Sequence, residues 1–351
     1  MAGAEQGGRS RNVTMHDVAR TAGVSTMTVS NVINGRSARV SDATRDRVLG
    51  VIADLGYRVN TTARSLRRGR TGVIGLAVPD LAAEYYGQLA DRLARRLRSH
   101  GLRLAVEGTH GHLDAELDTL ATAHMDTYDA VVLSVAAGDV DDLDRLQPDK
   151  PVVLVGERAF ASRYPHVHMD NVGGARLATA HLLAGGSRRI VALGGRDGDQ
   201  ESVGELRVKG YREAHEAHGV SVDPELVVHC YLDAASAHEA VTRLIRGGVE
   251  IDGVFALADS AAVGALRAVA DAGLAVPEDV AVVGFDNLPS GRFTVPSMST
   301  IEPGNDEMAD AVCAMLLAQL AGDEVGGPRL VMPEPSLVLR ESTRPLGHAV
   351  D

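Results

Sequence analysis

The sequence predicts an all-α helix-turn-helix headpiece at the N-terminus, followed by a larger α/β body of two doubly wound parallel-sheet subdomains. Three observations predict this architecture. Two short helical segments with apolar faces meet at Gly23, positive charge is concentrated before residue 70, and the remaining chain alternates short apolar runs with amphipathic stretches. Such alternation is typical of parallel sheets that helices cover on both faces.

The first two helices of the head are bounded by capping signals. Thr14 and Asp17 have the spacing of a capping box, which predicts the start of the first helix. Gly23 ends that helix and permits a tight turn. Ser25 is placed to cap a second helix over 26–33, and the pair forms a helix-turn-helix.

A third helix is predicted over 42–55, between a capping Ser41 and Gly56. It completes a DNA-binding domain that we expect to span residues 13–59. The segment 60–70 that follows has helix formers but little apolar surface, so a helix there should not be stable alone.

The body contains apolar segments that we predict as strands: 73–78, 102–107, 130–135, 152–155, 189–194, 226–231, 253–257 and 280–285. Amphipathic segments between them are predicted as helices: 84–99, 114–124, 173–184, 203–218, 235–246, 259–272 and 304–321. The pattern restarts near residue 188, which indicates two sheets rather than one large sheet.

The charge of the chain is divided unevenly. Residues 1–70 contain twelve arginines, no lysine and five acidic residues, a net charge of +7. The other 281 residues must then carry −19 to give the total of −12. An acidic body repels nucleic acid, so we expect contact with DNA to be confined to the basic head.

Other classes of protein are disfavoured by what the sequence lacks. Residues 1–12 are polar, without the apolar core of a signal peptide, and no apolar run approaches the ~18 residues that span a bilayer. We expect a disordered tail over 1–12, a cytoplasmic location and no membrane contact. Cys230 and Cys313 are far apart, so no disulfide framework, metal site or cofactor is expected.

An enzyme is also disfavoured. His215 and His218 are three residues apart, whereas the zincin motif requires two histidines at i and i+4. The sequence contains no GxSxG motif, P-loop or catalytic Cys/His pairing.

Charged side chains follow several predicted strands, where doubly wound sheets bind their ligands. These candidates are Asp80, Asp170 (after the stretch 166–169), Arg207, Asp259 and Asp286. Together they suit a ligand rich in hydroxyl groups, because each can hold two polar atoms. Three have a structural alternative: Asp80 as a turn residue, Asp170 at a crossing between subdomains, and Asp259 as a helix cap.

Two stretches, VTMHDVARTAGVSTMTVSNVING and VSDATRDRVLGVIADLGYRVNTTARSLRRGRTGVIGL, closely resemble the LacI/GalR family of bacterial transcriptional regulators. The likeness continues from Val13 to about Arg344. It implies a periplasmic-binding-protein-like sensor domain over 71–345, in which the chain crosses between subdomains near 170, 301 and 332. The subdomain boundaries are then as follows: an N-subdomain of about 71–170 and 302–331, and a C-subdomain of about 171–301 and 332–345.

The resemblance also implies how the head contacts a palindromic DNA operator. Helix 26–33 would lie in the major groove, with Thr26, Met27 and Asn31 facing base edges. Phosphate contacts are implied for Thr14, Ser25, Thr28 and Ser30, and Asn34 belongs to the same contact set. Plain helix surface or capping remains an alternative for Thr28 and Ser30.

Segment 60–70 corresponds in the family to a hinge helix that orders on operator DNA. Leu66 matches the leucine wedged into the minor groove, and Ala63 lies on the same face. Arg64 and Arg67 would contact phosphates. The alternative is a basic solvated linker, with Leu66 packed on the sensor domain.

For the sensor domain, the resemblance implies that Arg207 and Asp286 contact the effector and that Asp259 lines the pocket wall. Tyr85 and Tyr86 would lie over the ligand. Leu232 stands where many sugar-responsive members have Trp or Phe. These matches predict a repressor that binds DNA as a homodimer and responds to a sugar or sugar derivative as inducer.

Two alternatives remain open. One is a repressor that uses a purine or nucleoside as corepressor, and the other is a sugar-binding protein without a DNA function. The family further implies that the region of helix 84–99 helps to form the dimer interface.

Overall fold

The chain divides into two compact units, residues 1–71 and residues 72–351. The computed structural model describes residues 13–33, 40–57, 70–121, 125–137, 140–145, 148–156, 163–195, 202–322 and 330–344.

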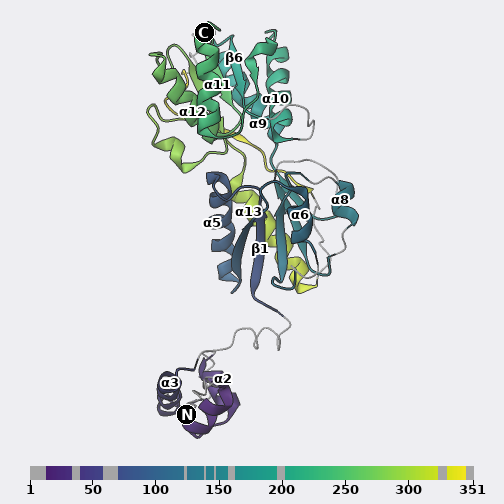
Figure 1. Cartoon of the computed structure of the whole chain (residues 1–351), viewed down its shortest axis with the longest axis vertical. Helices are drawn as coiled ribbons and strands as arrows, with labels where there is room; N and C mark the ends of the chain where they lie inside the picture. The colour runs from purple at the N-terminus through teal and green to yellow at the C-terminus, as the bar shows by residue number, and fades with distance from the viewer. Residues whose placement is uncertain are drawn as a thin grey trace, which may run out of the picture. The chain divides into compact units, whose positions relative to one another are not determined.

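The described part of the head contains three helices built around the predicted helix-turn-helix (Figure 1). Its helices are α1 (Met15–Ala22), α2 (Thr26–Ile33) and α3 (Asp42–Asp54). Gly23 ends α1 in the left-handed conformation, with φ at 65°, as glycine permits. Val18, Val29 and Val48, one from each helix, are fully buried together and form the centre of this small core.

The body contains two six-stranded sheets, one in each half. The first, in the order β11-β5-β4-β3-β1-β2, is parallel throughout. The second, in the order β12-β10-β9-β8-β6-β7, is parallel except for the antiparallel pair β10–β12. We call the half that contains the first sheet the N-subdomain and the half that contains the second sheet the C-subdomain.

The strands of the first sheet are β1 (Val73–Val78), β2 (Arg103–Gly108), β3 (Ala130–Ser134), β4 (Val152–Gly156), β5 (His166–His168) and β11 (Leu330–Val331). Those of the second are β6 (Ile190–Leu193), β7 (Val227–Val228), β8 (Gly253–Ala256), β9 (Ala281–Phe285), β10 (Ser299–Glu302) and β12 (Ser336–Val338).

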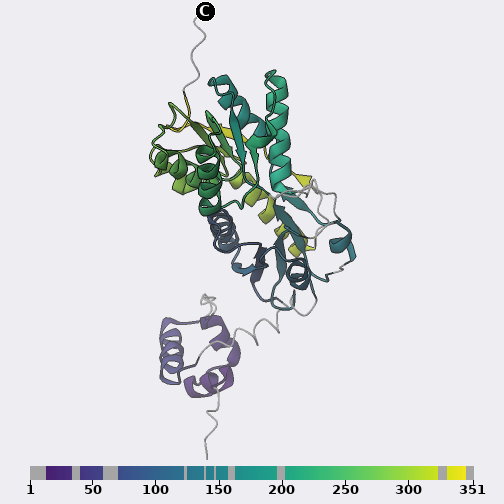
Figure 2. The same cartoon turned by 45° about the horizontal axis from the view of Figure 1, so that its top comes forward.

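Helices surround both sheets (Figures 1 and 2). Those beside the first sheet are α5 (Glu84–Ser99), α6 (Leu113–Thr119), α8 (Val140–Arg145) and α13 (Asn305–Ala321). Those beside the second are α9 (Asn171–Ala184), α10 (Val203–Ala217), α11 (Ala234–Arg246) and α12 (Asp259–Asp271). The short 3₁₀ helices η2 (Pro224–Leu226) and η3 (Pro289–Arg292) lie in the loops of the C-subdomain.

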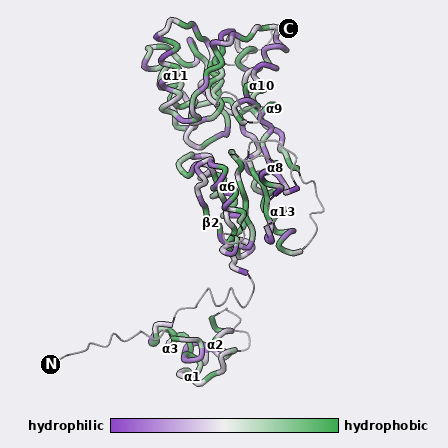
Figure 3. Tube along the Cα trace, turned by 45° about the vertical axis from the view of Figure 1, so that its right-hand side comes forward, coloured by the Kyte–Doolittle hydropathy of each residue, from purple (hydrophilic) through white to green (hydrophobic). Residues whose placement is uncertain are grey.

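Alternate residues of the central strands enter different cores, so each sheet is the middle of three layers. On β6, Ile190 and Ala192 join the core with α9 and α10, whereas Val191 and Leu193 join the core with α11 and α12. This explains why the strands read as uninterrupted apolar runs, since both faces are covered. Figure 3 shows the hydrophobic colour running along the strands of both halves.

The chain passes between the two sheets at three places. It leaves the first sheet after β5, returns from the second after β10, and passes back between β11 and β12. The second and third passages touch, because a Cβ atom added to Gly304 would come 2.4 Å from Pro333 Cβ. The carboxylate of Glu302 accepts hydrogen bonds from Gly304 N at 3.0 Å and Asn305 N at 2.7 Å, which fixes the start of α13.

The predicted fold class is confirmed, with differences at the edges. The helix predicted over 114–124 ends at Thr119, and α8 was not predicted because VDDLDR offers little apolar surface. Strands β10, β11 and β12 were also missing from the prediction. Each has only two to four residues and is held by pairing with distant parts of the chain.

Candidate functional site

The first turn of α2 carries Met27, the most exposed large hydrophobic side chain among the described residues of the head. Ser25 Oγ accepts a hydrogen bond from Thr28 N at 3.1 Å and lies 3.0 Å from Thr28 Oγ1, so these hydroxyls hold the helix start. Thr26 is exposed beside Met27, whose side chain is 72% exposed. A helix N-terminus with exposed side chains can contact a phosphate and a base edge together.

The other candidate residues of the head differ in exposure, and among them Thr14 is exposed. Ser30 and Asn31 are half-buried on α2. Thr14 forms the predicted capping box, because Asp17 N donates to Thr14 Oγ1 at 3.3 Å and Thr14 N donates to Asp17 Oδ2 at 3.0 Å. The predictions for Asn34, Ala63, Arg64, Leu66 and Arg67 fall outside the described residues.

Arg207 and Asp286 come together in the C-subdomain. Arg207 projects from α10 and is 1% exposed, with Nη2 at 3.5 Å from Asp286 Oδ1. Its Nε donates to Asn171 Oδ1 at 2.9 Å, and its Nη1 donates to the carbonyl of Leu257. The guanidinium carbon lies 3.7 Å from the centroid of the Phe285 ring. A buried cation needs such partners, since its desolvation is otherwise costly.

The backbone at Asp286 is unusual for a residue with a side chain. Asp286 and Asn287 follow β9 with φ at 112° and 50°, in a region that favours glycine. Asn287 Nδ2 donates to Glu302 Oε2 at 2.9 Å, and Asn305 Nδ2 donates to the Asp286 carbonyl at 2.9 Å. These bonds connect the candidate ligand residue to the second passage between subdomains.

Asp259 is fully buried, and the structure contradicts the alternative that it caps its helix. Ala258 is the N-cap residue of α12. Asp259 Oδ1 accepts a hydrogen bond from Thr300 Oγ1 at 2.5 Å, and Oδ2 accepts one from Leu288 N at 2.7 Å. Burial raises the pKa of the Asp259 carboxyl to about 7, against the lowering effect of these hydrogen bonds. Its carboxylate therefore joins α12 to β10 and the loop after β9.

Two other carboxylates have local structural partners. Asp80 Oδ1 accepts from Ala82 N at 2.8 Å, which is turn chemistry. Asp170 caps α9 by accepting from Gly173 N at 2.7 Å. The bond at Asp80 is the turn alternative stated above. Asp170 lies just after β5, where the chain leaves the first sheet, but its role as the cap of α9 was not predicted.

Tyr85 and Tyr86 begin α5, with ring centroids 5.0 Å apart in an edge-to-face arrangement. Tyr85 is buried and Tyr86 is half-buried. Leu232 is half-buried beside Gly194, where an added Cβ atom would come 2.6 Å from Leu232 Cδ2. Ser290 N lies 3.4 Å from Glu84 Oε1, so a loop of the C-subdomain reaches the start of α5.

Two members of this site were not singled out from the sequence. Asn171 contributes a partner to Arg207, and Glu302 contributes one to the loop that carries Asp286. Their adjacency to Asp170 and to the predicted crossing near 301 was the only available signal. The pairing itself is long-range, since Asn171 and Arg207 are 36 residues apart.

The fold and these residues define a class: a helix-turn-helix regulator with a two-subdomain ligand-binding body. A model described as bacterial regulatory proteins, lacI family, matches residues 14–60, and one described as periplasmic binding protein-like domain matches 179–343. The CelR regulator of Thermobifida fusca is 33% identical over 95% of this chain and 99% of its own. The chain belongs to the LacI family of bacterial transcriptional regulators, whose members are regulators rather than enzymes.

Solved structures of similar proteins agree with this family assignment. A regulator of the LacI family from Sanguibacter keddieii is 42% identical over 78% of this chain and 99% of its own, with a TM-score of 0.71. A CelR–cellobiose complex is 31% identical over 94% and 99%, with a TM-score of 0.67. The lac repressor dimer bound to operator is 25% identical over 95% and 99%, with a TM-score of 0.78.

None of the helices in the described part of the chain is long and apolar enough to cross a membrane. Within the same residues, no group of three His, Cys, Asp or Glu side chains is arranged to hold a metal ion.

Proposed function

We propose that this protein is a repressor that binds a palindromic operator as a homodimer in the cytoplasm, and that a small molecule controls its operator affinity. The observation that carries the proposal is the capped, exposed first turn of α2 in a LacI-family chain. Met27 supports it particularly, because an apolar side chain left 72% exposed suits contact with a thymine methyl.

A homodimer follows from the geometry of DNA recognition. One head reads few base pairs, whereas two heads related by a two-fold axis reach half-sites ~34 Å apart. The similar lac repressor was solved as a dimer on its operator. Leu89, Leu93 and Leu97 of α5 are buried within their own subdomain, so a dimer contact near α5 would use other side chains of that region.

The effector that we propose is a sugar or sugar derivative that acts as inducer. Arg207 and Asp286 offer paired donors and acceptors for adjacent hydroxyl groups, beside the aromatic face of Phe285. The similarity to a regulator solved with cellobiose supports this class of ligand.

Thermal unfolding of the full chain tests the effector. Mono- and disaccharides, sugar phosphates and purines would be added singly; a ligand at about 100 times its Kd adds about 2.7 kcal/mol of stability. An Asp286→Asn variant should lose the shift, whereas Asp279→Asn, at the amino end of the same strand, should keep it. A purine hit, or no sugar hit, would contradict the sugar proposal.

Selection of duplexes from a random library tests DNA binding. The full chain should enrich a palindromic sequence, and the sugar identified above should weaken binding to it. Tighter binding with the ligand would indicate a corepressor instead. Failure to enrich any sequence would contradict the DNA-binding function and favour a sugar-binding protein without one.

A further inference from the structure

The boundary between head and body is held by a buried carboxylate. Gly72 is the first residue of the body unit, immediately before β1. Gly72 N donates to Asp129 Oδ2 at 2.8 Å, and Asp129 N donates to the Val73 carbonyl at 2.8 Å. The Gly72 carbonyl accepts from Arg103 N at 3.0 Å. Hydrogen bonds from two directions therefore fix the point where the chain enters the body.

The backbone at this point also depends on its residue type. Gly72 has φ at 71°, a conformation that side chains disfavour, so the chain direction there is set by a glycine held at both its N–H and its carbonyl. Asp129 is only 8% exposed, so its bond to Gly72 N is protected from water.

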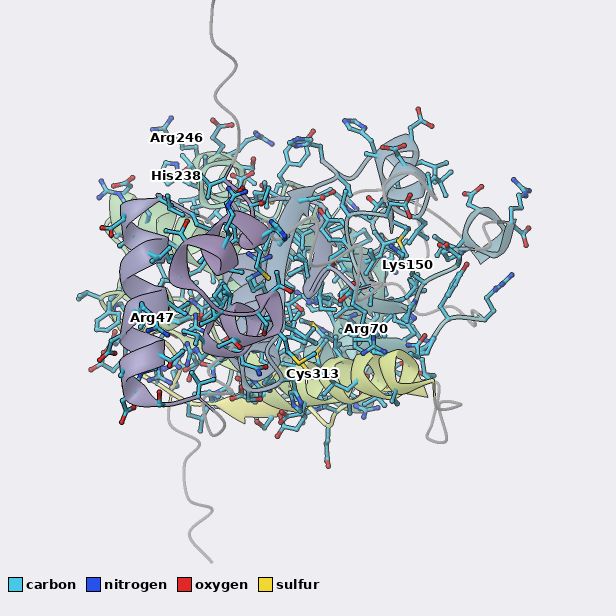
Figure 4. The ribbon with its side chains drawn as sticks, turned by 90° about the horizontal axis from the view of Figure 1, so that it is seen from below. Arg47, Arg70, Lys150, His238, Arg246 and Cys313 are labelled. Carbon is cyan, nitrogen blue, oxygen red and sulfur yellow. The ribbon has the colours of Figure 1, made fainter. Side chains whose placement is uncertain are left out.

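The loop that carries Asp129 is itself anchored. Lys150 Nζ donates to the carbonyls of Met125 at 2.7 Å and Tyr128 at 2.8 Å. The Tyr128 ring lies against β1, since a Cβ atom added to Gly75 would come 2.9 Å from Tyr128 Cδ2. Lys150 is labelled in Figure 4, which views the molecule from below. Asp129 is therefore held in place by its neighbours rather than by Gly72 alone.

Strand β1 runs from this anchor to the opposite end of the sheet, where its own carboxyl end lies. Its six residues span ~20 Å, from Gly72 to the loop that precedes α5 and its tyrosines. β1 is paired on both sides, with β2 and β3, so it moves with the whole sheet.

We propose that Asp129 is a positioning residue for the DNA-binding output. It locks Gly72 to the sheet of the N-subdomain, so that the orientation of that subdomain is passed to the head through the chain. This inference rests on the proposed function, because it assigns Asp129 to the control of operator binding. Without the lock, the head would bind its preferred sequence less selectively.

The test compares three full-length variants. Asp129→Ala removes the acceptor, and Asp129→Asn retains one. Asp126→Ala is the matched control, since Asp126 is in the same loop but its side chain is 73% exposed, 3.7 Å from Lys150 Nζ. Affinity is measured for the duplex enriched by the unaltered protein and for a random-sequence duplex. Hydrogen exchange is measured in peptides that cover residues 70–76.

Asp129→Ala should weaken binding to the enriched duplex about tenfold, the equivalent of one buried hydrogen bond, and leave random-duplex affinity unchanged. Exchange at Gly72 should rise, and Asp129→Asn should restore most of both properties. A merely structural role would instead lower affinity for both duplexes together, with a lower unfolding midpoint.

Unchanged selectivity in Asp129→Ala, or an equal loss in Asp126→Ala, would overturn the inference while the proposed function stands. If the unaltered protein enriched no duplex, the proposed function would fail, and with it the output assigned to Asp129. Unchanged exchange at Gly72 would overturn the lock by itself, whatever the DNA result.

Discussion

Replacing Asp259 with Asn should change how the stability of the protein depends on pH. The carboxyl of Asp259 has a pKa of about 7 when folded and an ordinary value of 3.8. Between pH 5 and pH 8 the unfolded carboxyl is ionised throughout, whereas the folded one changes from protonated to ionised. The folded state therefore holds the extra proton at pH 5, and the free energy of unfolding falls as the pH rises through 7.

The size of this effect follows from the two pKa values. Each pH unit below the folded pKa is equivalent to about 1.4 kcal/mol, so the contribution of Asp259 should fall by about 3 kcal/mol between pH 5 and pH 8. Asn keeps the shape of the side chain but does not titrate, so the variant should lack this component.

Urea unfolding of the unaltered protein and of Asp259→Asn at pH 5, 6, 7 and 8 measures this pH-dependent contribution. The free energy of unfolding of the unaltered protein minus that of Asp259→Asn should fall by about 3 kcal/mol over the range. Asp279→Asn, at an exposed position in the same subdomain, is unfolded in parallel as the control. A constant difference for Asp259→Asn would refute the reasoning that burial holds this carboxyl protonated near neutral pH.

Three further outcomes are expected. Thr14→Ala breaks the capping box of α1 and should destabilise the head by about 1 kcal/mol, measured by its unfolding midpoint, with Thr14→Ser close to the unaltered protein. Glu302→Ala leaves Gly304 N and Asn305 N without their carboxylate and should cost the body about 2 kcal/mol in urea unfolding; a loss below about 0.5 kcal/mol would contradict the role given to Glu302. Leu66→Ala should lose affinity for the enriched duplex and keep the ligand-induced thermal shift, and unchanged affinity in a titration would reject the minor-groove wedge.

The long helices and strands were predicted well because the residues that determine their limits are neighbours in the sequence. The capping box at Thr14 and the left-handed Gly23 set the limits of α1 with neighbouring residues only. The short strands could not be predicted in the same way. β11 has two residues, and its pairing with His166 and Val167 depends on contacts made across more than half of the body.

The same distinction between local and long-range causes applies to the residues of the candidate site. The sequence placed Arg207 and Asp286 after strands of one sheet, and the fold brings them to 3.5 Å. It left the alternatives for Asp170 open, and only the observed bond to Gly173 N identifies it as a helix cap. Asp259 was misjudged as a possible cap because its true partners, Thr300 and Leu288, are distant in sequence.

The three passages between the subdomains have a mechanical consequence. The third, residues 332–335, contains Pro333 and Pro335, whose rings fix φ and stiffen it. It lies against Gly304 of the second passage and continues from β11, which pairs with the strand that opens the first. Passages joined in this way restrict how the two subdomains can move relative to each other. Under the proposed function, every ligand that closes the body would therefore turn the subdomains about the same axis.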